Sequence, residues 1–130
     1  MRFKVNALIA LGLMLMASAA AAHHNMSAIF DFNARVTLTG TLTKYDWRNP
    51  HIELTMETQG DRIEVQTWRF EGPAPTVFRT REVTKVDFEQ AVGKSLTVEI
   101  SRARDGSRWG LIRNVTLPDG KTISLCPQNC

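Results

Sequence analysis

The chain has 130 residues, 22% of which are charged, and its formal net charge is +3. Arg2 and Lys4 lie in the first 22 residues, which hold no acidic residue, so the rest of the chain carries a net charge of only +1. This length leaves room for one domain, and a nearly neutral domain gives no electrostatic reason to expect nucleic acid as a partner.

Residues 1–22 have the three parts of a secretory signal peptide. A basic start is followed by an apolar block at 7–16 and by small residues up to Ala22. An uncleaved membrane anchor is the alternative, but the apolar stretch is short for about 30 Å of hydrocarbon. We therefore expect cleavage before His23, no stable membrane span after cleavage, and a periplasmic or secreted domain over residues 23–130.

The predicted first strand covers residues 35–45 and alternates with a period of two. Val36, Leu38 and Leu42 share one face with Gly40, while threonines occupy the other face. A glycine weakens a strand unless the strand bends sharply there. A long first strand with a central glycine is what a small closed barrel needs to turn its corner.

Shorter alternating runs predict the remaining strands. These runs cover residues 51–57, 63–70, 96–100, 108–117 and 122–125. In the third strand, Trp68 and Phe70 lie on the face opposite Val65. A short helix is predicted over residues 76–82, because Pro75 suits the first helical position.

The predicted order is three strands, one short helix, and then two or three strands. We therefore expect an all-β fold, a small Greek-key barrel of five to six strands with the helix between strands 3 and 4. This order and size are typical of the oligonucleotide/oligosaccharide-binding (OB) barrel. A plain β-sandwich is the alternative, and the helix after the third strand favours the barrel.

Both cysteines of the chain, Cys126 and Cys130, lie in its last five residues. Because exported proteins meet oxidising conditions, we expect a disulfide between them. So short a loop constrains the unfolded chain little, and the bond would fix only the tail. The alternative is a pair of thiolate ligands, which would favour Cu(I).

Several motifs stand in a characteristic order along the mature chain. They are His23-His24, Phe30-Asp31, Trp47-x-Asn49-Pro50-His51, Trp68-x-Phe70-Glu71-Gly72, Arg102-Ala103-Arg104-Asp105-Gly106 and Thr116-Leu117-Pro118-Asp119-Gly120. In this combination the chain resembles a widespread family of small exported bacterial proteins of unknown function. The resemblance implies export and a compact β domain, and it implies no settled activity. Asn25 and Met26 stand where the family has Ser and Phe, and the cysteine pair is not a family feature.

The three histidines, His23, His24 and His51, are the candidate metal ligands. Cleavage before His23 would give one residue a free α-amine and an imidazole, a chelating pair that suits Cu(II). Cleavage one residue earlier would leave a histidine second and third in the chain, which also favours Cu(II). The alternative is incidental copper binding at the chain start, with His51 only bonding its own turn or packing on Trp47.

The second hypothesis is an envelope protein that recognises a partner or an anionic glycan without a metal. Its candidate residues are Trp47, Asn49, Trp68, Arg104 and Arg108, with Tyr45 and Trp109 as further aromatic residues. Aromatic side chains can serve as a stacking face. The alternative is that these rings fill the core and that the arginines are solvated surface charges.

No catalytic constellation is visible in the sequence. Neither G-x-S-x-G nor H-E-x-x-H occurs, and carboxylates such as Glu64 and Glu71 have no evident acid–base partner. We therefore expect a binding module and not an enzyme. Its leading candidate ligand is a copper-like ion, Cu(II).

Overall fold

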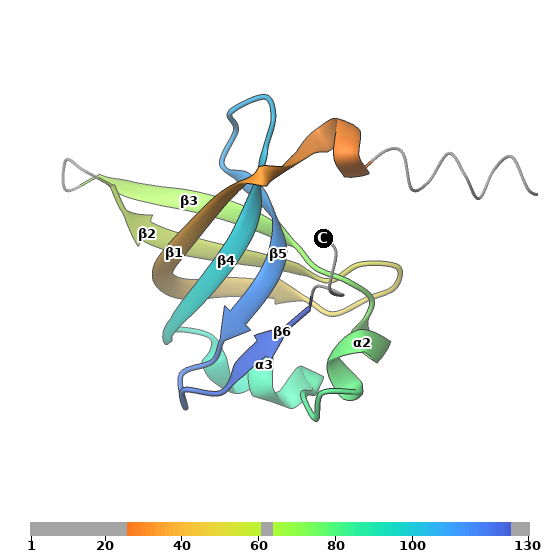
Figure 1. Ribbon diagram of the computed structural model, residues 1–130. Helices are drawn as coiled ribbons and strands as arrows, with labels where there is room; N and C mark the ends of the chain where they lie inside the picture. Colours follow the sequence, from red (N-terminus) through yellow and green to blue (C-terminus); the bar gives the residue numbers. More distant parts are fainter. Residues whose placement is uncertain (1–25, 61–63, 126–130) are drawn as a thin grey trace, which may run out of the picture.

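The computed structural model describes residues 26–60 and 64–125 (Figure 1). Its strands are β1 (Phe30–Asp46), β2 (Glu53–Gln59), β3 (Val65–Glu71), β4 (Ser95–Ala103), β5 (Trp109–Thr116) and β6 (Thr122–Ser124). The helices α2 (Pro75–Arg79) and α3 (Lys85–Ala91) follow β3, and residues 26–29 are helical just before β1. The predicted order of strands around a helical segment is confirmed.

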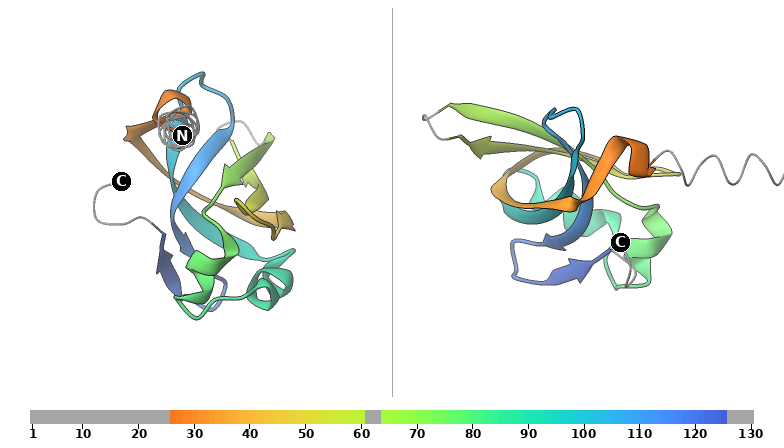
Figure 2. Two further views of the ribbon diagram at one scale, coloured as in Figure 1. Left: turned by 90° about the vertical axis from the view of Figure 1, so that its right-hand side faces the viewer. Right: turned by 45° about the horizontal axis from the view of Figure 1, so that its top comes forward.

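Five of the strands close into a barrel. The hydrogen-bonded order is β3-β2-β1-β4-β5-β6, and β3 also pairs with β5. This last pairing is parallel and joins residues 69–71 to residues 109–111. It closes the ring, and β6 extends from β5 outside it (Figure 2). The connectivity confirms the small all-β, OB-like barrel expected from the sequence.

Strand β1 serves both halves of the barrel because it changes partners along its length. It pairs with β4 through residues 30–41 and with β2 through residues 41–46. The register with β2 shifts between Leu42 and Lys44, which marks a bulge at the corner. A single long strand therefore bends from one side of the barrel to the other.

Gly40 lies immediately before this change of partner. A Cβ atom at that position would collide with the backbone oxygen of Glu57 and would lie 2.8 Å from Cγ2 of Thr58. Only a residue without a side chain therefore lets β2 pass this close to β1. The corner expected of this long strand therefore lies just after Gly40, at the register shift between Leu42 and Lys44.

The interior of the barrel is built by alternate residues of its strands. Leu54, Met56, Trp68 and Phe70 are at most 6% exposed, whereas Val65 is 59% exposed. The predicted placement of Trp68 and Phe70 on the face opposite Val65 is thus confirmed. Side chains at the intervening positions of β2 and β3 point to the outside of the barrel.

The connection between β3 and β4 contains two helices, where the sequence predicted one over residues 76–82. Helix α2 already ends at Arg79, and Glu82 has a φ angle of 58°. A residue in this left-handed region cannot continue a right-handed helix. The chain therefore starts a second helix, α3, and both helices lie at one end of the barrel (Figure 1).

Helix α3 begins with a capping box between Thr84 and Asp87. The Asp87 carboxylate accepts hydrogen bonds from the Thr84 backbone N–H at 2.7 Å and from the Thr84 hydroxyl at 2.9 Å. The backbone hydrogen bond is the main cause that holds the pKa of Asp87 below its ordinary value of 3.8. The sequence signal that would have revealed α3 is this Thr-x-x-Asp spacing.

Replacing Asp87 by Asn should lower the free energy of unfolding by about 0.5 kcal/mol at neutral pH, because a negative charge in the first turn favours the helix. The pKa of this carboxyl is lower in the folded than in the unfolded chain. The contribution is therefore present above the ordinary value of 3.8 and is lost as the pH falls through the lower folded-state pKa. Urea unfolding of both proteins at a series of pH values measures it. A difference that stays constant down to acidic pH would contradict this role.

Candidate functional site

Only part of the predicted metal site falls on described residues. Outside them lie the predicted leader at 1–22 and the residues His23, His24, Cys126 and Cys130. His51 is described, and it lies in the loop between β1 and β2. The site can therefore be built upward from His51.

The loop that carries His51 is tied to the end of β3. The Ile52 backbone N–H donates to the oxygen of Pro73, and the Gly72 N–H donates to the oxygen of Ile52. His51 Nδ1 lies 2.7 Å from Oε1 of Glu71, the last residue of β3. The two atoms are at ion-pair distance, although the contact departs from a straight N–H···O hydrogen bond.

This contact leaves the other ring nitrogen of His51 available. Nδ1 is buried against the carboxylate, while the side chain as a whole is 39% exposed. A histidine that ligates a metal usually turns its second ring nitrogen to a carboxylate, which fixes the orientation of the ring. His51 and Glu71 have this arrangement, with Nε2 as the nitrogen that can bind.

His51 alone does not make a metal centre. Among residues 26–60 and 64–125, no three His, Cys, Asp or Glu side chains lie close enough to hold an ion together. Glu53, which pairs across the strands with Glu71, does not complete such a group. Further ligands would have to come from parts of the chain beyond these ranges.

The two tryptophans proposed as a stacking face pack within the protein. The Trp47 ring lies 5.3 Å from the Phe78 ring and 5.4 Å from the Phe88 ring, between centroids. Trp68 is only 6% exposed and stacks on Phe70. Their rings therefore contribute to the core and its helical cover, and Trp68 has no face for a ligand.

The polar residues of the second hypothesis, Asn49, Arg104 and Arg108, lie in two loops. Asn49 is exposed in the turn before His51, where the peptide bond to Pro50 is cis. Arg104 donates through Nε to the backbone oxygen of Ser27 at 2.9 Å and lies 3.7 Å from Asp31. Arg104 therefore ties the segment before β1 to the loop between β4 and β5. Arg108, at the other end of that loop, is exposed.

The tryptophan on the outer face is Trp109, at the start of β5. The guanidinium carbon of Arg69 lies 4.4 Å from the centre of its ring, and the Phe30 ring approaches its edge with centroids 4.8 Å apart. Sequence analysis named Trp109 among the aromatic residues but missed Arg69. Alternation along β3 places Arg69 outside, opposite in phase to Trp68, and this signal was available.

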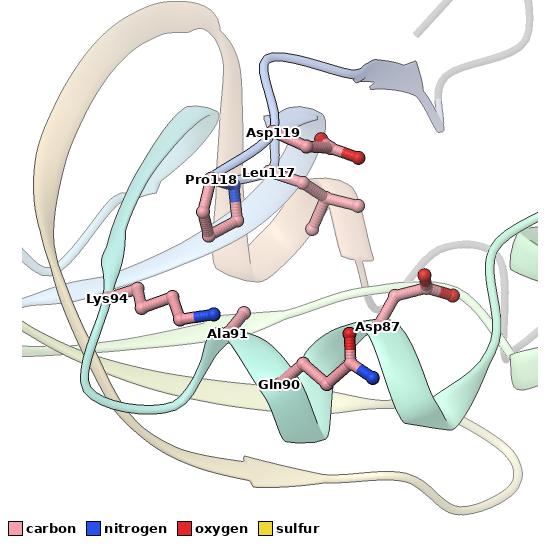
Figure 3. A pocket seen from close by; sticks show the side chains of 7 residues that line it. All are labelled: Asp87, Gln90, Ala91, Lys94, Leu117, Pro118 and Asp119. Atoms are coloured by element: carbon pink, nitrogen blue, oxygen red, sulfur yellow. The ribbon is translucent and has the colours of Figure 1, made fainter.

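A small hollow of about 110 Å³ lies between α3 and the turn that joins β5 to β6 (Figure 3). The carboxylates of Asp87 and Asp119 on its rim both accept hydrogen bonds from residues close to them in the sequence. Asp87 caps α3, and Asp119 accepts a hydrogen bond from the Lys121 backbone N–H at 2.9 Å. We therefore interpret this hollow as a by-product of helix and turn packing.

Comparisons with known proteins support one part of the resemblance seen in the sequence, which is the match to a family without a known function. No curated protein and no solved structure matches the chain. Within the part that the structure describes, no helix is long and apolar enough to cross a membrane. A model for a family of unknown function matches residues 10–114, a range that contains His23, His24 and His51 and ends before the Thr116–Gly120 motif. Because this match covers most of the chain, the protein belongs to the family of unknown function DUF6152.

Proposed function

We propose that this chain is an exported β-barrel module that binds a copper-like metal ion through His51, assisted by His23 and His24 at the mature terminus. The observation that carries the proposal is the contact of His51 Nδ1 with Glu71 at 2.7 Å. A carboxylate beside one ring nitrogen orients the other toward an incoming ion. The module is a binding protein of the periplasm or of the secreted fraction.

The anchoring of the segment before β1 supports the participation of the terminus. Arg104 holds the backbone oxygens of Ser27 and Ile29, through its side chain and its backbone N–H respectively. This anchor lies next to Trp109, at the start of β5. Two residues further along β5, the parallel pairing with β3 reaches Glu71. His24 precedes Ser27 by three residues, so it has a reach of roughly 10 Å from the anchor.

The donor set suits a divalent copper ion. Cleavage after Ala22 gives His23 both an α-amine, with an ordinary pKa near 7.7–8.0, and an imidazole. A metal can displace the proton of such an amine at neutral pH. Nitrogen ligands suit Cu(II), the tightest binder in the divalent series, and Nε2 of His51 adds a nitrogen held by the barrel.

Replacing His51 by Ala or Glu71 by Gln should weaken Cu(II) binding by roughly 10- to 100-fold. The first change removes a ligand, and the second removes the carboxylate that orients it. The measurement is a Cu(II) titration against a competing chelator, using purified chain that begins at His23. A tag of several residues before His23 should also weaken binding, because it moves the α-amine away from both His23 and His24.

The matched control is Glu53→Gln. Glu53 is an acid on the same face and pairs across the strands with Glu71, and this change removes one negative charge without touching His51. Its Cu(II) affinity should stay within about two-fold of the parent chain. If the His51 and Glu71 variants bind as tightly as this control, the barrel supplies no ligand and the proposal fails.

A further inference from the structure

Four outward side chains form a row across four neighbouring strands. Lys44 of β1 pairs with Thr55 of β2, Thr55 pairs with Arg69 of β3, and Arg69 pairs with Trp109 of β5. We call these four residues the cation row. Lys44 and Arg69 are exposed, and Thr55 and Trp109 are half-buried. Three strand spacings give the row a length of about 14 Å.

Three positive charges on or beside the cation row have no ion-pair partner in the part of the chain that the structure describes. Within residues 26–60 and 64–125, no carboxylate lies within 4.0 Å of the charged groups of Lys44, Arg69 or Arg108, the residue before Trp109. Arg69 instead covers the Trp109 ring at 4.4 Å. Cations that are not neutralised by the protein remain available to a negatively charged ligand.

A second row of opposite character runs beside the first. Asp46 pairs with Glu53, and Glu53 pairs with Glu71. Asp46 lies 3.1 Å from Arg48 and Glu71 lies 2.7 Å from His51, whereas among the described residues no cationic group lies within 4.0 Å of the Glu53 carboxylate. Ionised carboxylates only accept hydrogen bonds, whereas lysine and arginine only donate them. The two rows together match a ligand that carries both carboxylates and hydroxyl groups.

Hollows lie at both ends of the cation row. The first, of about 110 Å³, is lined by Lys44, Asp46, Arg48, Glu53 and Thr55. The second, of about 400 Å³, is lined by Ala28, Ile29, Arg104, Asp105 and Trp109. An extended ligand lying along the row would thus run from one depression to the other.

We propose that this surface binds a linear acidic polysaccharide, with its chain lying across the strands. Uronate carboxylates contact Lys44 and Arg69, sugar hydroxyls donate to the acidic row, and a sugar ring packs at Trp109. The acidic row favours the polysaccharide over single-stranded DNA, because each uronate sugar carries free hydroxyl groups that can donate to Glu53, whereas the DNA backbone carries none. This surface adjoins the proposed metal site and shares Glu71 with it. The test below rests on Lys44 and Arg69, which take no part in metal binding.

The test measures binding of polygalacturonate to the purified chain, with fully methyl-esterified polygalacturonate as the uncharged counterpart. Binding should require the free carboxylates and should weaken with added salt. Arg69→Gln and Lys44→Gln should each weaken it by about ten-fold, as expected for the loss of a hydrogen bond between charged groups. The matched control is Arg79→Gln, which removes the same charge from α2 and should leave binding unchanged.

Lys44→Gln keeps the test decisive if loss of Arg69 disturbs the stacking on Trp109, because Lys44 is exposed and lies two strands away. Equal binding of the esterified polymer would overturn the proposal. So would an equal loss in the Arg79 variant, since net charge alone would then explain the result. Tighter binding of oligo(dT) that also depends on Lys44 and Arg69 would assign the surface to single-stranded nucleic acid instead.

Discussion

Replacing Gly40 by Val is expected to lower the free energy of unfolding by about 3 kcal/mol, the upper part of the range for overpacked positions. The new side chain would meet the backbone oxygen of Glu57 and Cγ2 of Thr58. A backbone oxygen cannot move aside as a flexible side chain can, so relief requires β1 and β2 to separate at the corner. Urea unfolding followed by tryptophan fluorescence measures the loss.

Valine makes this a strict test, because β-branched residues normally favour strands. A destabilisation therefore has to come from crowding. The control is Gly93→Ala, since Gly93 has a φ of 80° with open space around its Cβ position. The Gly93→Ala change should lower the free energy of unfolding by only about 1–2 kcal/mol, which is the cost of placing a residue with a side chain in the left-handed region. If the Gly40 variant loses no more than this control, the close approach of the two strands does not limit stability.

Local patterns predicted the strands of this protein, but they did not predict which strands meet. Alternation at Leu54 and Met56 marks a strand wherever that strand goes, and a glycine in a long strand marks a bend. The contact that closes the barrel joins Arg69 to Trp109, forty residues apart, in a short parallel pairing. Nothing within either segment specifies the other, since parallel neighbours are set by the path of the whole chain.

The second helix was missed for a different reason. Its exposed Val86 and buried Phe88 are too close in sequence to give a clear helical period, and α3 is only seven residues long. The capping box of Thr84 and Asp87 was the stronger local signal. Short helices of this kind are selected by their caps and by the surface that they cover, more than by periodicity.

In the candidate site too, the sequence pointed to single residues, and only the fold showed which of them meet. His51 stood out in the sequence because histidines are few, whereas Glu71 looked like a carboxylate without a partner. The structure joins them because the loop before β2 is bonded to the end of β3. Trp68 and Trp109 carry the same ring, yet one is in the core and the other is on the outer face. Only the closure of the barrel decides which ring a ligand can reach.

Replacing Phe88 by Ala is expected to lower the free energy of unfolding by about 3–5 kcal/mol, the range for emptying a buried aromatic position. Phe88 is fully buried, and its ring centre lies 5.6 Å from that of Phe78 and 5.4 Å from that of Trp47. These three rings join α2, α3 and the end of β1 in one cluster. Loss of the Phe88 ring should therefore loosen both helices together, which urea unfolding monitored by circular dichroism would measure.

The matched control lies on the same helix. Val86 is 54% exposed, so Val86→Ala removes apolar atoms from α3 without opening a cavity and should change stability by less than about 0.5 kcal/mol. Trp47→Ala should also lower the free energy of unfolding, by less than Phe88→Ala and by more than Val86→Ala, because the Trp47 ring is only partly buried against the core. A Trp47 variant of unchanged stability would remove this ring from the packing and return it to the candidates for a binding surface. The same measurement thus separates a structural tryptophan from an exposed one.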